Sequence, residues 1–166
     1  MRLSRRNRQD AGATLVEFAI VLPLLLLLLF GLVEFARIVS EFTTVRTAAR
    51  EGARFATTVD AASGTPNYAD CSGIVAAAQS RAVVGNLESI EVVWSFPTGG
   101  TFSCSDTNDV DPTWTTEDAI PAGTEISVTV TSAFDSIVPI MEVFLDGIAL
   151  DSTQTRQIFK GVIESD

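Results

Sequence analysis

Apolar positions are concentrated in the N-terminal third of the chain. Residues 13–33 hold a single charged side chain, Glu17, and include six consecutive leucines at 24–29. A helix that is apolar on every side belongs either in lipid or in a large protein core. Twenty-one helical residues cover about 31 Å, the thickness of the bilayer hydrocarbon. Because 166 residues are too few to bury such a helix in a core, the pattern predicts a membrane span.

The helix is expected to continue beyond Val33, as one unbroken element from Ala13 to Val59. Apolar residues recur there at helical steps of three or four, at Phe35, Ile38, Val39, Phe42, Val45, Ala49, Ala53 and Ala56. Charged residues occupy most of the other positions and predict a solvated face, at Arg37, Glu41, Arg46, Arg50 and Arg54. Two ion pairs at a spacing of three are expected, Glu34 with Arg37 and Glu51 with Arg54. Pro23 predicts a kink in the span. Gly31 predicts a second soft point or a close helix contact, and Gly52 a weakened or bent turn.

The last hundred residues predict a small domain rich in strands. A linker is expected at 61–66, followed by a short helix that Asp70 or Ser72 caps and that stops at Gly85 and Asn86. Alternating apolar residues predict strands over 90–96 and 126–131. Residues 137–148 are too interrupted for a second span, and 149–159 predict a polar terminal strand. The fold class is therefore α+β, a long membrane helix followed by a mostly antiparallel sheet.

Charge suggests how the chain is oriented. Four arginines and one aspartate precede the span, whereas residues 61–166 carry fifteen acidic and three basic residues. The positive-inside rule places the N-terminus in the cytoplasm and the C-terminus outside a cytoplasmic (inner) membrane. An acidic ectodomain also argues against nucleic acid as a partner.

The residues before the span indicate proteolytic processing. An ordinary secretory signal has a shorter apolar run followed by a small-residue cleavage site. Here the small residues Ala11, Gly12 and Ala13 precede the run, which is where a prepilin-type peptidase cuts. A cut between Gly12 and Ala13 divides the chain into a basic leader (1–12), a helix (13–60) and an extracytoplasmic domain (61–166).

Glu17 would then be the fifth residue of the mature chain. A lone acid inside a span costs about 2.5–3.5 kcal/mol at the centre of the bilayer and less near its edge. In a bundle of such helices, its carboxylate can pair with the ammonium group of a neighbour's Ala13. The alternative is that Glu17 lies in the cytoplasmic headgroup layer without a specific role.

Taken in order, these residues resemble a known family. The motifs are GATLVEFA at 12–19, VLP at 21–23, the leucine run, Gly31, EFAR at 34–37 and AAREGAR at 48–54. They are similar to the TadE-like minor pseudopilins of the tight-adherence (Flp) pilus. The resemblance covers residues 12–56. It implies cleavage by a prepilin peptidase, a type IV pilin-like helix before a small pilin-like ectodomain, and a role in assembling or decorating a thin adhesive pilus, with other pilins and the pilus assembly machinery as partners.

The two cysteines lie on the outward side. Cys71 and Cys104 predict one disulfide, with two buried free thiols as the alternative. Residues 105–118 read SDTNDVDPTWTTED and raise the possibility of a calcium site. The pattern departs from the EF-hand, because Val110 stands at a ligand position and Asp111 where glycine is required. A solvated acidic loop with Trp114 packed on the sheet is the preferred interpretation.

Catalytic chemistry finds no support in the sequence. The chain has no histidine, so the commonest general base and metal ligand are missing. We find no nucleophile elbow and no phosphate-binding loop. The sequence therefore predicts no enzyme, cofactor or metal, and a minor pseudopilin of a pilus. The alternatives are a single-pass membrane protein whose ectodomain binds a ligand or partner, and a minor pseudopilin of a secretion system.

Overall fold

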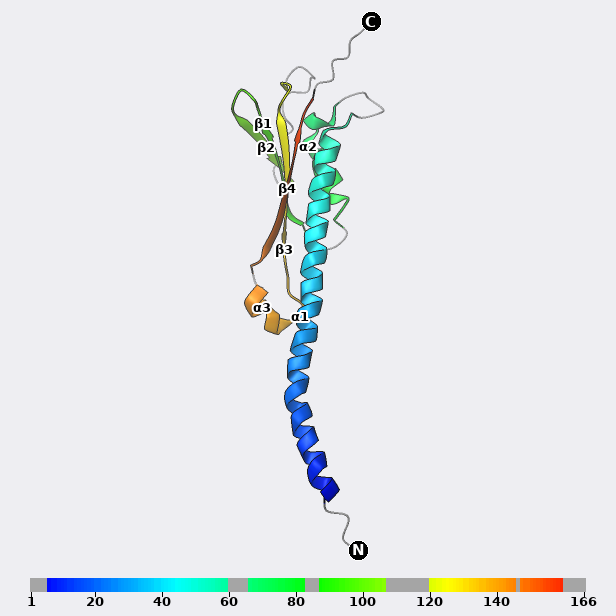
Figure 1. The fold of residues 1–166 in the computed structure, drawn as a ribbon. Helices are drawn as coiled ribbons and strands as arrows, with labels where there is room; N and C mark the ends of the chain where they lie inside the picture. The colour runs from blue at the N-terminus through cyan, green and yellow to red at the C-terminus, as the bar shows by residue number, and fades with distance from the viewer. Residues whose placement is uncertain (1–5, 60–65, 83–86, 107–119, 146, 160–166) are drawn as a thin grey trace.

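The computed structural model describes residues 6–59, 66–82, 87–106, 120–145 and 147–159. A single helix, α1 (Arg6–Ala56), runs along the whole molecule, and the rest of the chain packs against its C-terminal half (Figure 1). The helix begins before the predicted Ala13 and ends before the predicted Val59. Helix-compatible residues such as Arg8 and Gln9 extend its start, because no proline or cap interrupts them. The α+β prediction is confirmed.

Four strands form one antiparallel sheet in the order β2-β1-β3-β4. They are β1 (Leu87–Ser95), β2 (Thr101–Ser105), β3 (Glu125–Ala133) and β4 (Ala149–Gln157). The predicted period of two is confirmed, since Ile90, Val92 and Trp94 of β1 are buried and so are Ile126, Val128 and Val130 of β3. The β1–β2 turn contains Gly99 and Gly100, both with positive φ, a backbone conformation that glycine adopts without strain.

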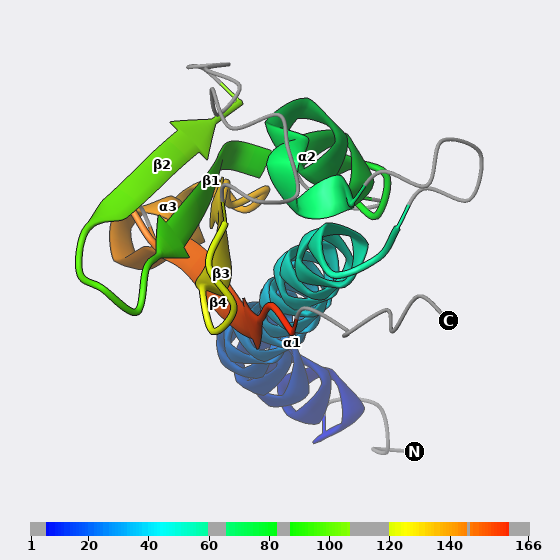
Figure 2. The ribbon, with the colours of Figure 1, turned by 90° about the horizontal axis from the view of Figure 1, so that it is seen from above.

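Both larger helices cover the same face of the sheet (Figure 2). The short helix α2 (Cys71–Gln79) packs on α1 and on β1. Asp70 caps α2, because its carboxylate accepts a hydrogen bond from the Gly73 amide at 2.8 Å. The helix ends at Gln79, earlier than the predicted Gly85, with Ser80 as its C-cap. A 3₁₀ turn, Asn67–Ala69, precedes it.

Small residues on α1 let the sheet approach the helix closely. Ala48, Ala49, Ala53 and Ala56 are all fully buried. A Cβ atom at Gly52 would lie 3.1 Å from Val128 Cγ1 and 3.2 Å from Ala78 Cβ, tighter than ordinary packing. Gly52 thus provides room for β3 and α2 to pack against α1. From the sequence, Gly52 was expected only to weaken or bend the helix, and this packing role was missed.

The predicted apolar face of α1 is partly wrong. Phe35, Val39 and Phe42 are exposed, whereas Glu34 and Glu41, the second assigned to a solvated face, are buried. The sheet lies against the side of the helix that carries these acids and the small residues, rather than the side that carries the phenylalanines. Close approach favours small side chains, and the two carboxylates have hydrogen-bond partners that compensate their burial.

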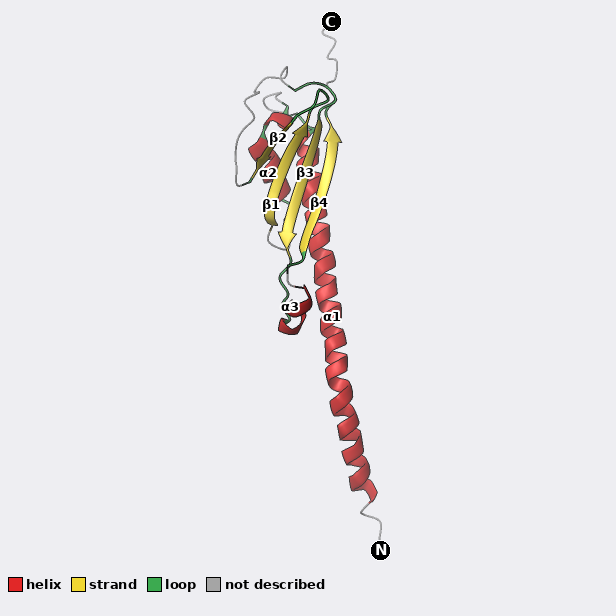
Figure 3. Ribbon diagram, turned by 90° about the vertical axis from the view of Figure 1, so that its left-hand side faces the viewer, coloured by secondary structure: helices red, strands yellow, loops and turns green. Residues whose placement is uncertain are grey.

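The segment between β3 and β4 contains a third helix, α3 (Pro139–Leu145). It lies below the sheet, beside α1, where the ectodomain ends and the bare part of α1 begins (Figure 3). The prediction that residues 137–148 do not form a second span is confirmed, since α3 has seven residues. The terminal strand predicted over 149–159 is confirmed as β4.

Candidate functional site

The N-terminal half of α1 is largely uncovered by the described part of the chain. Its large apolar side chains are exposed, namely Leu15, Val16, Phe18, Ile20, Val21, Leu24 to Leu29, Phe30, Leu32 and Val33. Among the described residues, α1 is the one helix long and apolar enough to cross a membrane. The length and composition fit a single-pass membrane protein.

The predicted processing and assembly residues lie on this bare helix. Gly12, Ala13, Glu17 and Pro23 are all exposed, and the helix continues without interruption through Pro23. Within the described residues, the Glu17 carboxylate has no cation beside it. Cleavage after Gly12, the role of Glu17 and the kink at Pro23 remain predictions.

A polar cluster joins α1 to the ectodomain where the apolar run ends. One carboxylate oxygen of Glu34, Oε1, accepts hydrogen bonds from the backbone amides of Ile137 at 2.8 Å and Val138 at 2.9 Å. It also accepts one from Ser136 Oγ at 3.1 Å. The other oxygen, Oε2, pairs with Arg37 at 2.9 Å, as the sequence predicted. Glu34 is 2% exposed, so its charge is satisfied almost entirely by these groups.

Arg37 extends the cluster to the end of β3. Its guanidinium donates a hydrogen bond to the Asp135 carbonyl at 3.2 Å and lies over the Phe134 ring, 5.2 Å from the centroid. This position allows a cation–π contact. Glu34 and Arg37 together hold the 134–138 backbone against α1 at the boundary between the bare and the covered parts of the helix.

Burial raises the pKa of Glu34, but three hydrogen bonds and the Arg37 charge outweigh it. The pKa therefore lies below its ordinary value of 4.5. A depressed pKa stabilises the fold at pH values above the unfolded-state pKa, and that stabilisation is lost as the pH falls through the folded-state pKa. Hydrogen bonds from Arg54, with its charge and that of Arg81, likewise lower the pKa of Glu51 against the opposing effect of burial.

Replacing Glu34 with glutamine is expected to cost about 1–2 kcal/mol at neutral pH, because charge-assisted hydrogen bonds to two amides are weakened. The difference from the wild type should begin to shrink as the pH falls below 4.5, where the unfolded wild-type chain takes up a proton at Glu34, and should disappear once the pH is below the lower folded-state pKa. Thermal unfolding of the full chain in detergent micelles at several pH values measures this. Glu142→Gln, at an exposed carboxylate on α3, is the control, and an equal effect of both variants would contradict the assignment.

A second buried acid lies one heptad further along α1. Glu41 accepts a hydrogen bond from the Ser132 hydroxyl near the end of β3, and both residues are buried. Sequence reasoning missed both acids as contact residues. The sequence does contain a signal for this contact. Glu34 and Glu41 are seven residues apart, which places them on the same helical face as the buried Val45, Ala48 and Gly52.

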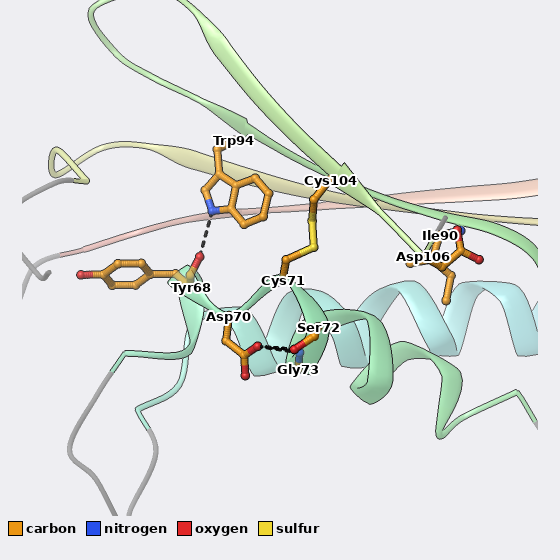
Figure 4. Close-up of a disulfide and its surroundings, with 9 residues drawn as sticks. All are labelled: Tyr68, Asp70, Cys71, Ser72, Gly73, Ile90, Trp94, Cys104 and Asp106. Carbon is orange, nitrogen blue, oxygen red and sulfur yellow. Dashed lines mark hydrogen bonds between the residues drawn. A yellow bond between two sulfur atoms is a disulfide. The ribbon is translucent and has the colours of Figure 1, made fainter. Parts of the chain in front are cut away.

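The disulfide prediction is confirmed. Cys71, at the start of α2, is bonded to Cys104 of β2, with their Cα atoms 6.6 Å apart. Figure 4 shows the bond beside Trp94, whose indole N–H donates a hydrogen bond to the Tyr68 carbonyl at 3.0 Å. These contacts fix the 67–71 segment and α2 on the sheet.

The calcium hypothesis falls mainly outside the described residues, because residues 107–119 are not among them. Trp114 also lies there. Within the described residues, no group of three or more Cys, Asp or Glu side chains is placed to hold a metal ion. The calcium site is therefore left untested.

Comparison with known proteins gives one result. The family model described as "TadE-like protein" matches residues 12–54, which is the segment that carries the resemblance noted in the sequence. No curated protein and no solved structure matches the chain. The match covers the bare half of α1 and most of its packed half, and stops before α2.

Proposed function

Because residues 12–54 match the TadE-like family, we propose that the chain is a minor pseudopilin that assembles with a tight-adherence pilus. The observation that carries the proposal is the coincidence of this match with a bare apolar helix. The first half of the matched segment, from Gly12 to Val33, is the part of α1 that the ectodomain leaves largely uncovered, and the second half carries the ectodomain. A helix of this kind is stored in the bilayer and later packs against other helices.

In this proposal the chain first resides in the cytoplasmic membrane, with its N-terminus inside. The four arginines before the span favour that orientation. The disulfide fits it, because disulfides persist outside the cytoplasm. A prepilin peptidase would cut after Gly12, removing the arginines and leaving a charged amino group on Ala13.

Assembly would then use the whole exposed side of α1. Above the span, Phe35, Val39 and Phe42 continue the apolar surface at steps of four and three. Such spacing places them on one helical face. Neighbouring pilin helices are the partners that fit, because they would bury this face outside the membrane, where lipid is not available to cover it.

Glu17 would determine the axial alignment of neighbouring α1 helices in that assembly. A carboxylate and an ammonium group that are each costly in an apolar environment compensate one another when paired. Glu17 and the new amino group of Ala13 are one helical turn apart along α1, so a carboxylate can reach a neighbour's amino terminus after a small axial shift. We propose that the chain is not an enzyme and acts only through such contacts.

The Glu17→Ala variant tests the proposal. It is expected to insert into the membrane normally, and to reduce the number of surface pili by about tenfold or more, as loss of an ion pair in a low-dielectric environment implies. Electron microscopy of the native host and immunoblots of its membranes measure the two quantities. Val16→Ala, at the neighbouring exposed position, is the control. Normal piliation with Glu17→Ala would contradict the assembly role.

Processing is tested separately by the intact mass and N-terminal sequence of protein extracted from membranes of its native host. A mature chain that begins at Ala13 supports the pilin-type route. A chain that retains residues 1–12 favours the alternative of a static single-pass protein with a partner-binding ectodomain. Whether the assembly belongs to a pilus or to a secretion system is decided by which of the two is lost on deletion of the chain.

A further inference from the structure

The segment between β3 and β4 extends from the sheet toward the bare half of α1. A backbone hydrogen bond from the Phe134 amide to the Ile148 carbonyl, at 3.0 Å, closes its base. Between these residues the chain leaves the sheet, forms α3 and returns to β4 (Figure 3). The excursion is therefore a defined projection from the sheet.

This projection reaches the level at which the apolar run of α1 ends. A methyl group at Gly31 would lie 4.0 Å from the Cε atom of Met141. Gly31 is two residues before Val33, the last residue of the run, and so lies about 3 Å below its end along the helix axis. If residues 13–33 cross the bilayer, α3 lies beside the helix at the outer surface of that bilayer.

Glu34 and Arg37 hold the projection in this position. Glu34 accepts hydrogen bonds from the amides of Ile137 and Val138, just before α3 begins, and Arg37 donates to the Asp135 carbonyl. The connection from α1 to α3 is thus a set of short polar contacts immediately above the apolar run. It fixes the height of α3 relative to the span.

The projection presents apolar side chains outward. Ile137 is 70% and Val143 is 81% exposed. Its sequence from Ser136 to Leu145, SIVPIMEVFL, contains one charged residue, Glu142. Side chains of this kind bind to the headgroup region of a membrane when they lie next to it.

We propose that residues 137–145 form a lipid-contacting anchor that rests in the outer headgroup layer, next to the point where α1 leaves the bilayer. The inference rests on the membrane-spanning part of the proposed function. The insertion is shallow, because the exposed carboxylate of Glu142 requires water or headgroups. Lipid is the occupant that the geometry favours, since the anchor is continuous with the surface that the span already presents to lipid.

Such an anchor would give the chain a second contact with the membrane, in addition to the membrane-spanning helix. A single helix can tilt and slide in the bilayer, whereas a helix with a second contact at its outer end has a defined depth. The ectodomain would then be held at a fixed height and orientation before assembly. Extraction into a fibre would have to remove residues 137–145 from lipid.

Depth-dependent quenching of tryptophan fluorescence tests the proposal. Full-length Val143→Trp is reconstituted in vesicles of phosphatidylethanolamine and phosphatidylglycerol that contain phosphatidylcholine brominated at a shallow acyl position. Leu26→Trp, in the middle of the span, reports membrane insertion. Ser103→Trp, at an exposed position on β2, is the control away from lipid. The signal of the native tryptophans is subtracted by using the wild-type chain.

The expected result is quenching of Val143→Trp about twofold stronger than that of Ser103→Trp, as contact with the interface implies, together with quenching of Leu26→Trp. Quenching of Leu26→Trp without that of Val143→Trp would overturn the anchor and leave the membrane span intact. A blue-shifted Val143→Trp emission that bromine does not quench would show protein as the occupant, and would also overturn it. Absence of quenching in both Val143→Trp and Leu26→Trp would refute the membrane span as well as the anchor.

Discussion

Replacement of Trp94 by alanine is expected to lower the free energy of unfolding of the ectodomain by about 4 kcal/mol, the typical cost of removing a large aromatic side chain from a packed core. Trp94, near the end of β1, is fully buried in the core between the sheet and the two helices α1 and α2. Its ring lies 5.5 Å from that of Phe102, and its indole N–H is bonded to the Tyr68 carbonyl. The variant therefore loses both the packing of the ring and the hydrogen bond to the Tyr68 carbonyl.

Trp94→Phe separates these two effects. It keeps an aromatic ring beside Phe102 and removes the indole donor, so the expected loss is smaller, about 1–2 kcal/mol. Guanidinium unfolding of the full chain in detergent micelles, followed by near-ultraviolet circular dichroism, measures both variants. Equal losses for alanine and phenylalanine would show that the hydrogen bond, and not the ring, carries the stabilisation.

Reduction of the Cys71–Cys104 disulfide is expected to cost about 3–4 kcal/mol, the chain-entropy value for a loop of this length. The two cysteines are 33 residues apart, and the bond joins the start of α2 to the edge strand β2. Without it, β2 keeps its pairing with β1 and α2 keeps its packing on α1 and β1, but the covalent link between the two elements is lost. We expect both elements to become the least stable part of the fold.

The measurement compares the oxidised and reduced wild-type chain in the same guanidinium titration. The Cys71→Ser, Cys104→Ser double variant is the matched control, because it lacks the bond under both conditions and should not respond to reductant. An unchanged midpoint of the wild type on reduction would contradict the stabilising role. Hydrogen exchange that rises first at the amides of β2 and α2 would locate the loss.

The packing of the ectodomain on α1 has a consequence for assembly. Gly52 and its neighbouring alanines bring β3 and α2 onto the helix, and Glu41 and Glu34 bind the lower end of β3 and the following loop. Contacts of these kinds extend along more than twenty residues of α1, from Glu34 to Ala56. Packing of the bare helix in a fibre would therefore set the position of the ectodomain on the fibre surface.

Local pattern was sufficient for much of this protein. The run from Ala13 to Val33 predicts a helix that is long and apolar enough to cross a membrane, and the structure has such a helix. The alternation in β1 and β3 identifies strands with one buried face, because the side-chain period of a strand is two. Cys71 and Cys104 pair as expected, since they are the only two cysteines. Each of these signals depends on neighbours in sequence or on composition.

The face of α1 that meets the sheet was decided only by tertiary structure. Hydrophobicity favoured Phe35, Val39 and Phe42, but the sheet packs where the side chains are small and where Glu34 and Glu41 find donors 91 to 104 residues away. Partners at such separations leave no periodic signal near the acids themselves. The sequence by itself therefore determines the long helix, the short helix α2 and the strands β1, β3 and β4, and it marks residues 13–33 as a candidate membrane span, but it does not indicate α3 or β2. The fold determines which side of the long helix is covered and which side stays exposed.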